Sequence, residues 1–258
     1  MDIASVGGIL LALIGILGGL MMEGGSLAQI TQPTAMLIVL GGTAGAVMMQ
    51  FPINIFFAAI KQFMQVFFTR SRKDEMVVAQ LVSLAVKARK TGIVKLDADL
   101  HTVADPFLKQ ALMLAIDGTE PAAVRQIMEL ELENNAEFEE RIPQVLESAG
   151  GFAPTVGIIG AVIGLIQVMQ HLDNIEEVGH GIAIAFVATI YGIGLANLVF
   201  LPAAGKLRIR QQQEHMVKEM MLEGVISIQE GMNPRMIEIK LRTFLFESKQ
   251  PRAAEGTA

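Results

Sequence analysis

Four apolar segments, each about long enough to cross a lipid bilayer, restrict the folds that this chain can adopt. They span residues 3–22, 33–51, 152–171 and 181–202. A helix needs roughly 20 apolar residues to cross the hydrocarbon, where backbone polar groups must be satisfied internally. The mean hydropathy of +0.48 and a charged fraction of only 18% agree with this pattern. We therefore expect an all-α, polytopic membrane protein with four transmembrane helices.

The four segments pair into two hairpins, because only short polar turns separate the members of each pair. These turns are residues 23–32 and 171–180. The long interval between the hairpins holds most of the charge, so we expect it to form a large helical domain outside the membrane. The expected domains are a first transmembrane hairpin, a cytoplasmic helical domain, a second transmembrane hairpin, and cytoplasmic C-terminal helices with a tail, at residues 1–52, 53–151, 152–205 and 206–258.

Basic residues indicate the cytoplasmic side of the membrane. Residues 61–141 hold 11 of the 20 lysines and arginines, and residues 206–252 hold the other nine. Because cytoplasmic loops carry the excess of Lys and Arg, we expect the middle domain and the C-terminal region to be cytoplasmic. With an even number of spans, the N-terminus is expected there too. No long basic run accompanies the net charge of -6, which argues against nucleic acid as a partner.

Small residues line one face of the third apolar segment and one face of the fourth. They recur every three or four positions, which lets a neighbouring helix backbone approach closely. They are Gly157, Gly160, Ala161 and Gly164 in the third segment, and Ala185, Ala188, Gly192 and Ala196 in the fourth. The opposite side of the third segment suits lipid or a neighbouring subunit and carries Val156, Ile159, Val162, Ile163 and Ile166. An ordinary glycine-rich buried helix with no task beyond packing is the alternative interpretation.

The polar regions follow a helical period. Residues 53–68 carry an apolar stripe typical of a helix at the membrane interface or against a neighbour, formed by Ile53, Phe56, Phe57, Ile60, Phe63, Met64, Phe67 and Phe68. We expect helices to stop at Gly92 and Gly231 and one to start at Pro121. The acidic run 129–140 indicates a solvated helix face rather than a metal site, because no histidine accompanies it.

The sequence offers no basis for catalysis. Its histidines lack a metal-binding spacing, it has no P-loop or strand-borne GxGxxG motif, and without cysteine it has no thiolate nucleophile. We therefore expect neither an enzyme nor a bound cofactor or metal.

The predicted membrane helices also lack an internal carboxylate, the group that usually marks a proton relay. Their cores offer as polar side chains only Thr43, Thr155, Gln167, Thr189, Tyr191 and Asn197. Hydroxyl groups in membrane helices often bond their own backbone. If ions cross the membrane here, a partner must supply the titratable group.

Five short motifs are distinctive. FAPTVGIIGAVIGL begins at Phe152 and YGIGLANLVFLP at Tyr191, while GGSL, ARKTG and IQEGMNPR occupy residues 24–27, 88–92 and 228–235. Together with the two hairpins, they resemble the MotA and PomA family of flagellar motor stator proteins over nearly the whole chain. The third-segment motif alone is shared with TolQ and ExbB proteins. Those relatives have three membrane helices and lack the Arg-Lys-x-Gly segment, so the stator family is favoured.

The resemblance implies an assembly and a function. Five copies would surround two copies of a single-span partner, MotB or PomB, whose membrane aspartate carries the ion and whose periplasmic domain grips peptidoglycan. Ion flow would rotate the ring of five in the bacterial inner membrane. Its cytoplasmic domain would then turn the rotor through the switch protein FliG.

The resemblance also assigns roles to individual residues. Arg89, Lys90 and Asp97 fall where the family contacts FliG, and Asp97 stands where relatives often have the longer Glu. Pro154, expected at the start of the third membrane helix, and Pro202, expected at the end of the fourth, match prolines that couple ion flow to rotation. Simple helix punctuation by these prolines is the alternative interpretation.

By the same resemblance, the ion pathway contains Thr155, Ala161, Ala188 and Thr189. Sodium-type relatives have threonines in place of Ala161 and Ala188 and an aspartate in place of Gln32. A sodium ion needs several oxygen ligands, whereas a proton needs only a carboxylate and a water chain. We therefore predict proton coupling. The alternatives are a sodium-coupled stator that uses backbone carbonyls, an ExbB- or TolQ-like energising subunit of another envelope machine, and a small-molecule carrier.

Overall fold

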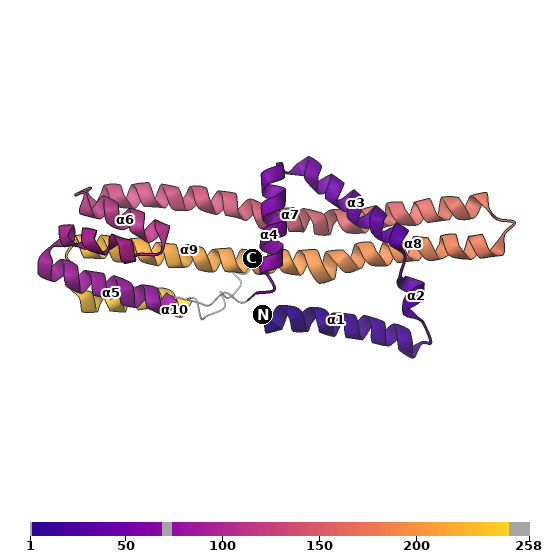
Figure 1. The fold of residues 1–258 in the computed structure, drawn as a ribbon, viewed down its shortest axis with the longest axis horizontal. Coiled ribbons are helices and arrows are strands. Elements are labelled where there is room, and N and C mark those ends of the chain that lie inside the picture. Colours follow the sequence, from indigo (N-terminus) through magenta and orange to yellow (C-terminus); the bar gives the residue numbers. More distant parts are fainter. Residues whose placement is uncertain (1, 69–73, 248–258) are drawn as a thin grey trace, which may run out of the picture. The chain divides into compact units, whose positions relative to one another are not determined.

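The computed structural model describes residues 2–68 and 74–247, and every regular element in these ranges is a helix. Figure 1 shows the elements in chain order. They are α1 (Ile3–Met22), α2 (Leu27–Ile30), α3 (Pro33–Gln50), α4 (Ile53–Gln65), α5 (Asp74–Thr91), the 3₁₀-helix η1 (Ile93–Thr102), α6 (Pro106–Ile116), α7 (Pro121–Gln170), α8 (Ile175–Leu195), the π-helical turn η2 (Ala196–Phe200), α9 (Leu201–Gln229) and α10 (Pro234–Glu247). The predicted all-α fold is confirmed.

Four helical stretches are long and apolar enough to span a membrane, as predicted. They lie in α1, in α2 and α3, in α7, and in the run from α8 into α9. The turn between the last two stretches is shorter than the predicted 171–180, because α8 already begins at Ile175. Asn174 explains the early start, since its side-chain oxygen accepts a hydrogen bond from the backbone N–H of Glu176 at 3.2 Å and so caps the helix.

The chain divides into two compact units. The first, which we call the membrane unit, comprises residues 1–69 and 139–209, and the second, the polar unit, comprises residues 70–138 and 210–258. Helices α7 and α9 each contribute residues to both. The domain boundary expected at residue 151 falls inside α7. The positions at which the chain enters and leaves the membrane stay predictions.

In the membrane unit, α3 lies across the paired helices α7 and α8 (Figure 1). One cluster of buried side chains joins α3 to α8 and consists of Ala35, Val39, Val187 and Ala188, with Tyr191 and Leu195 packed against it. A second cluster joins α3 and α4 to α7 and α9, and its members include Val47, Ile55, Ala149, Ala203 and Ala204. These two clusters fix the hairpin that carries the candidate site.

Helix α4 leaves most of the predicted apolar stripe exposed, which favours the membrane interface over a neighbour as the surface that this stripe meets. Its buried residues are Ile55 and Ala59, followed by Val66 just beyond its end. Phe56, Phe63 and Phe67 are half-buried, whereas the rest of the predicted stripe is exposed, namely Ile53, Phe57, Ile60, Met64 and Phe68. The small Ala59 lets α4 lie close to its neighbours, and the bulky side chains remain outside on a stripe suited to the membrane interface.

Helix α1 contributes no buried residue, and polar contacts fix its beginning instead. The Asp2 carboxylate accepts a hydrogen bond from the Ser5 backbone N–H at 3.2 Å and pairs with the Lys206 ammonium at 2.5 Å. The Asp2 backbone N–H donates to the Phe67 carbonyl at 2.8 Å. Because Lys206 lies in α9, these contacts tie the beginning of α1 to the end of the fourth apolar segment.

A single apolar core holds the polar unit together. It gathers side chains from α5, η1, α6, α7, α9 and α10, and its fully buried members include Leu81, Leu96, Leu112, Met128, Met220 and Ile237. The predicted helix boundaries are confirmed here. Gly92, at φ +85°, follows α5, Gly231, at φ +73°, separates α9 from α10, and Pro121 opens α7. Both glycines occupy the left-handed region that side chains disfavour.

Candidate functional site

The contact between α7 and α8 is built on glycines. A Cβ atom placed on Gly157 would lie 2.8 Å from the Ala188 carbonyl oxygen, and one placed on Gly164 would lie 2.8 Å from the Gly181 carbonyl oxygen. The two backbones therefore touch directly, which larger residues would prevent. The small residues that the sequence aligned on each helix thus face one another.

Two further glycines, Gly192 and Gly160, extend the contact between α7 and α8, and Gly160 also brings α3 to it. A Cβ atom on Gly192 would lie 2.5 Å from the Ala153 carbonyl oxygen, and one on Gly160 would meet both the Ala188 Cβ and Ile38 of α3. Val156, predicted to face lipid or a neighbouring subunit, instead packs on Gly42 of α3 in the same chain and is buried. That prediction is wrong because α3 covers this part of α7, which the helical period of α7 alone does not reveal.

Pro154 and Pro202 both lie within continuous helical backbone, so the alternative interpretation of these prolines as simple helix punctuation is wrong. Their expected places at the ends of the third and fourth membrane spans stay predictions. Pro154 is inside α7, and Pro202 is the second residue of α9, directly after η2. The sequence becomes apolar at residue 152, but the backbone is helical on both sides of this position. A proline inside a helix removes one hydrogen bond, which leaves the Gly150 carbonyl without its usual donor. Leu201, beside Pro202, packs on Gly150, so the structure brings the two proline segments together.

The π-helical turn η2 is a feature that the sequence analysis missed. Its hydrogen bonding is shifted by one residue, because the Leu201 backbone N–H donates to the Ala196 carbonyl. Such turns interrupt α-helices mostly at functional positions. The only signal in the sequence was the neighbouring Pro202, which cannot donate a hydrogen bond within a helix.

The four predicted ion-pathway residues do not share one environment. Thr155 is exposed, Ala161 and Thr189 are half-buried, and Ala188 is 0% exposed within the α7–α8 contact. Both hydroxyls bond their own helix: Thr155 donates to the Phe152 carbonyl at 2.8 Å, and Thr189 donates to the Ala185 carbonyl at 3.1 Å. Three of the four thus lie on surfaces that this chain leaves open, whereas Ala188 spaces the helices.

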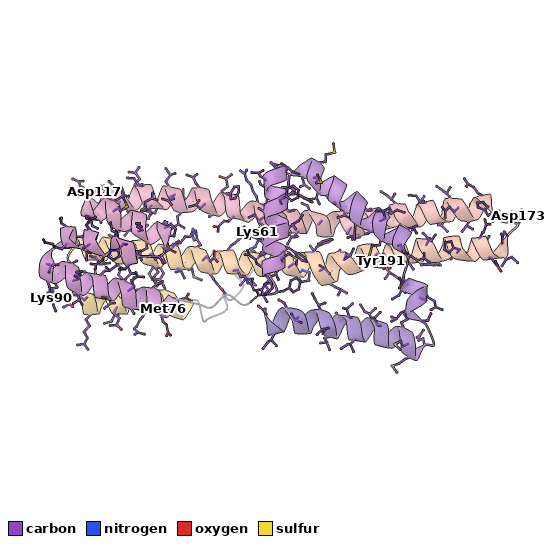
Figure 2. All side chains as sticks on the ribbon, viewed as in Figure 1. Lys61, Met76, Lys90, Asp117, Asp173 and Tyr191 are labelled. Atoms are coloured by element: carbon purple, nitrogen blue, oxygen red, sulfur yellow. The ribbon has the colours of Figure 1, made fainter. Side chains whose placement is uncertain are left out.

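The predicted rotor-binding residues lie on both sides of the turn at Gly92 in the polar unit. Arg89, Lys90 and Asp97 are all exposed. Figure 2 shows Lys90 at the end of α5, from which η1 continues. Leu96 is 0% exposed, so it anchors η1 in the core and holds the adjacent Asp97 at the surface.

An ion pair that the sequence analysis missed fastens this turn. The Lys87 ammonium of α5 contacts the Asp99 carboxylate of η1 at 2.6 Å. Only the fold identifies this pair, because the chain reverses between the two residues. By joining α5 to η1, the pair sets the positions of the exposed charges between them.

Tyr191, the single tyrosine of the chain, anchors the turn that joins the two helices of the first hairpin (Figure 2). Its hydroxyl donates to the Ile30 carbonyl at 2.6 Å and accepts from the Gln32 backbone N–H at 3.2 Å. A tyrosine inside a predicted membrane helix was the available signal, since its hydroxyl needs a polar partner when it is buried.

Glu223 joins three helices of the polar unit. It lies in α9, accepts a hydrogen bond from Arg125 of α7 at 2.8 Å and pairs with Lys240 of α10. Burial raises the pKa of Glu223, but the hydrogen bonds from Lys240 and Arg125 outweigh burial and hold this pKa below its ordinary value. The carboxylate is 18% exposed, so the pair is shielded more than a surface ion pair.

Glu223→Gln is expected to destabilise the polar unit by about 1 kcal/mol near neutral pH, since hydrogen bonds to charged groups contribute about 1.5–3 kcal/mol and both cations are partly solvated. Because folding lowers this pKa, the stabilisation is complete above the unfolded pKa of about 4.3 and disappears as pH falls through the folded value. Thermal unfolding of the purified chain at neutral and acidic pH measures the difference. Glu238→Gln is the matched control, because its i,i+4 pair with Arg242 is more exposed. Equal effects of the two variants would contradict the prediction.

Comparisons with known proteins identify the family. Residues 99–220 match the model of the MotA/TolQ/ExbB proton channel family, and residues 6–92 match that of the Motility protein A N-terminal region. Motility protein A of Bacillus subtilis is 36% identical over 99% of this chain and 95% of its own length. Chemotaxis protein PomA of Vibrio alginolyticus is 32% identical over 93% of this chain and 97% of its own length.

Two solved assemblies have the same fold. The C. jejuni MotAB structure matches with a TM-score of 0.90 at 31% identity, covering 99% of this chain and 100% of that one. The flagellar MotAB stator complex from Bacillus subtilis matches with a TM-score of 0.84 at 36% identity, covering 93% and 94%. The fold and the site therefore define a multi-pass membrane protein that is a subunit of an ion channel. Proteins of this class are not enzymes. The chain belongs to the MotA/TolQ/ExbB proton channel family and, within it, to the MotA and PomA group of motility proteins.

Proposed function

We propose that this chain is the membrane subunit of a flagellar stator, which couples proton flow to rotation of the flagellar rotor. The supporting observation is the close packing of α7 on α8, with Pro154 inside α7 and Pro202 at the beginning of α9, in a chain that matches MotAB assemblies over nearly its whole length. The four membrane-length stretches and the match to the Motility protein A N-terminal model favour this function over an ExbB- or TolQ-like energising subunit.

A second polypeptide completes the ion path. No carboxylate lies in residues 3–22, 33–51, 152–170 or 178–205, and an ion relay across a bilayer usually needs one. A MotB-like, single-span partner supplies the missing aspartate. Five copies of this chain surround the partner dimer in the inner membrane, with the polar unit and both termini in the cytoplasm, as the distribution of Lys and Arg indicates.

The coupling ion is the proton. Of the four pathway residues, Ala161 and Ala188 carry only methyl groups, so just two hydroxyl oxygens, those of Thr155 and Thr189, remain. The path therefore offers too few side-chain oxygens to replace the hydration shell of sodium. A proton requires only the partner carboxylate and a chain of water molecules.

Complementation of a bacterium that lacks its own stators tests this function. The chain and its MotB-like partner are expressed together, and swimming speed is recorded with sodium removed at constant pH and then with a protonophore. We expect motility to need both polypeptides, to survive sodium removal and to stop with the protonophore. Motility that survives the protonophore and stops without sodium would reverse the ion assignment. Absence of motility despite an assembled complex would contradict the stator function.

The exposed charges around Gly92 contact the rotor protein FliG. Arg89→Glu is expected to lower swimming speed several-fold, because it places a like charge against the rotor, and reversal of the opposing rotor charge is expected to restore part of the speed. Lys109→Glu is the control, since Lys109 is also exposed but lies on α6. Exposed ion pairs contribute about 1 kcal/mol or less, so the complex itself is expected to form normally. Full motility of the Arg89 variant would rule out this contact.

A further inference from the structure

The turn η2 leaves one backbone carbonyl without a donor in either of two hydrogen-bonding patterns. In the present structure the Leu201 N–H donates to Ala196, so the Asn197 carbonyl would need a donor from residue 202, which is a proline without an N–H. In a regular α-helix, Leu201 would donate to Asn197. The Leu198 carbonyl would then face the same proline. The carbonyl that faces Pro202 thus moves by one residue.

The side chain of Asn197 stabilises the helical turn that precedes η2. Its side-chain amide donates to the Ile193 carbonyl one turn earlier at 2.9 Å. The Ala196 N–H also reaches the carbonyls of Gly192 and Ile193. The Gly192 and Ile193 carbonyls, in the turn before η2, therefore both have donors.

Thr43 of α3 provides an unused donor at the same level. Its side chain is 3% exposed, and its hydroxyl has no hydrogen-bond partner within the described part of the chain. Val39, one turn earlier, belongs to the cluster with Ala188 and Leu195. Val47, one turn later, belongs to the cluster with Phe200 and Ala203. Thr43 is on the same buried face of α3, between one residue that packs before η2 and one that packs at its end and beyond.

We infer that η2 is the bending point of the fourth membrane helix, and that Thr43 is a positioning residue whose hydroxyl satisfies the carbonyl released when η2 changes its hydrogen-bonding pattern. An unsatisfied carbonyl buried in a membrane protein is costly, so a donor from α3 lowers the free energy of the second pattern. Since Pro202 lies at this turn, the inference rests on the proposed coupling of ion flow to rotation and gives that coupling a mechanical element.

One substitution tests the inference, because a Thr43 hydroxyl that only fills space and one that positions η2 predict opposite results. Thr43→Val keeps the side-chain shape and removes a buried polar group that has no partner, so for a purely packing residue it is neutral or stabilising. We expect instead that Thr43→Val assembles normally but lowers rotation speed under load several-fold, and that Thr43→Ser restores most of the speed. Thr34→Val is the matched control, since it makes the same change on an exposed face of α3.

A second measurement tests the bending point without relying on motility. Hydrogen–deuterium exchange of the Leu201 amide is followed for the full-length chain in lipid nanodiscs. Because Thr43→Val disfavours the second pattern, the Leu201 N–H changes acceptor less often, and its exchange is expected to become several-fold slower than in the native chain or in Thr43→Ser. Unchanged exchange in Thr43→Val would overturn the inference even if the chain drives no motor. A native chain that supports no motility, with slower exchange in Thr43→Val, would contradict the proposed function and leave the bending point supported.

Discussion

Gly192→Ala is expected to break the α7–α8 contact and to remove most of the assembled complex from the membrane. The added Cβ would lie 2.5 Å from the Ala153 carbonyl oxygen. That obstacle is backbone in the middle of a helix, which cannot rotate aside as a side chain can, so the two helices must separate. Overpacking a well-packed contact destabilises proteins by about 1–3 kcal/mol. The effect of this variant is expected at the top of that range, because membrane helices associate largely through such close contacts.

The amount and the melting temperature of the complex in mild detergent measure this effect. Gly194→Ala is a closely matched control, because it makes the same change two positions along α8 at a site with no atom within 4 Å of the added Cβ. We expect the control to assemble like the native chain. Equal yield and stability of the two variants would show that the α7–α8 contact is looser than the structure indicates.

The hairpins and their close packing could be predicted from the sequence because both depend on local patterns. Uninterrupted hydropathy shows where a helix can cross a bilayer. The three- and four-residue spacing of Gly157, Gly160 and Gly164 fixes one face of α7, whatever that face touches. The turns at Gly92 and Gly231 were predictable for a similar reason, since a positive φ is a property of a single residue.

Features that depend on a third element could not be predicted in this way. Val156 was assigned to the side that faces lipid or a neighbouring subunit because the period of α7 shows two faces, whereas α3 creates a third contact at Gly42. On α4, the sequence left open whether the stripe with Phe57 and Met64 meets the membrane interface or a neighbour, and the packing around the small Ala59 leaves that stripe outside. In both cases a neighbouring helix, and not amphipathic period, selects the buried side.

The same limit applies within the candidate site. The pair of Lys87 and Asp99 crosses a chain reversal, so neither residue indicates the other in the sequence. The turn η2 depends on how α8 accommodates Pro202 against α3 and α7. The continuity of α7 through residue 152 was also missed, because the end of the charged region coincided with a proline that can start a helix.

Pro154→Ala and Pro202→Ala are expected to leave insertion and assembly intact while nearly abolishing rotation. Each proline lies inside continuous helix, where alanine is intrinsically more favourable by about 3 kcal/mol. Alanine at 154 supplies the N–H that the Gly150 carbonyl lacks, and alanine at 202 supplies one for η2. Both variants should therefore be at least as stable as the native chain. A loss of rotation then cannot be attributed to weaker folding and must come from a stiffer helix.

Rotation speed of tethered cells, together with the yield and melting temperature of the complex, separates these effects. Pro143→Ala is the control, because Pro143 is also inside α7 but lies before the apolar segment and outside the motif that resembles the stator family. We expect this variant to assemble and to rotate. If Pro154→Ala or Pro202→Ala reduced assembly in proportion to speed, the prolines would be structural elements only. Normal assembly with little or no rotation would show that the bend which these prolines permit in α7 and α9 is part of the coupling step.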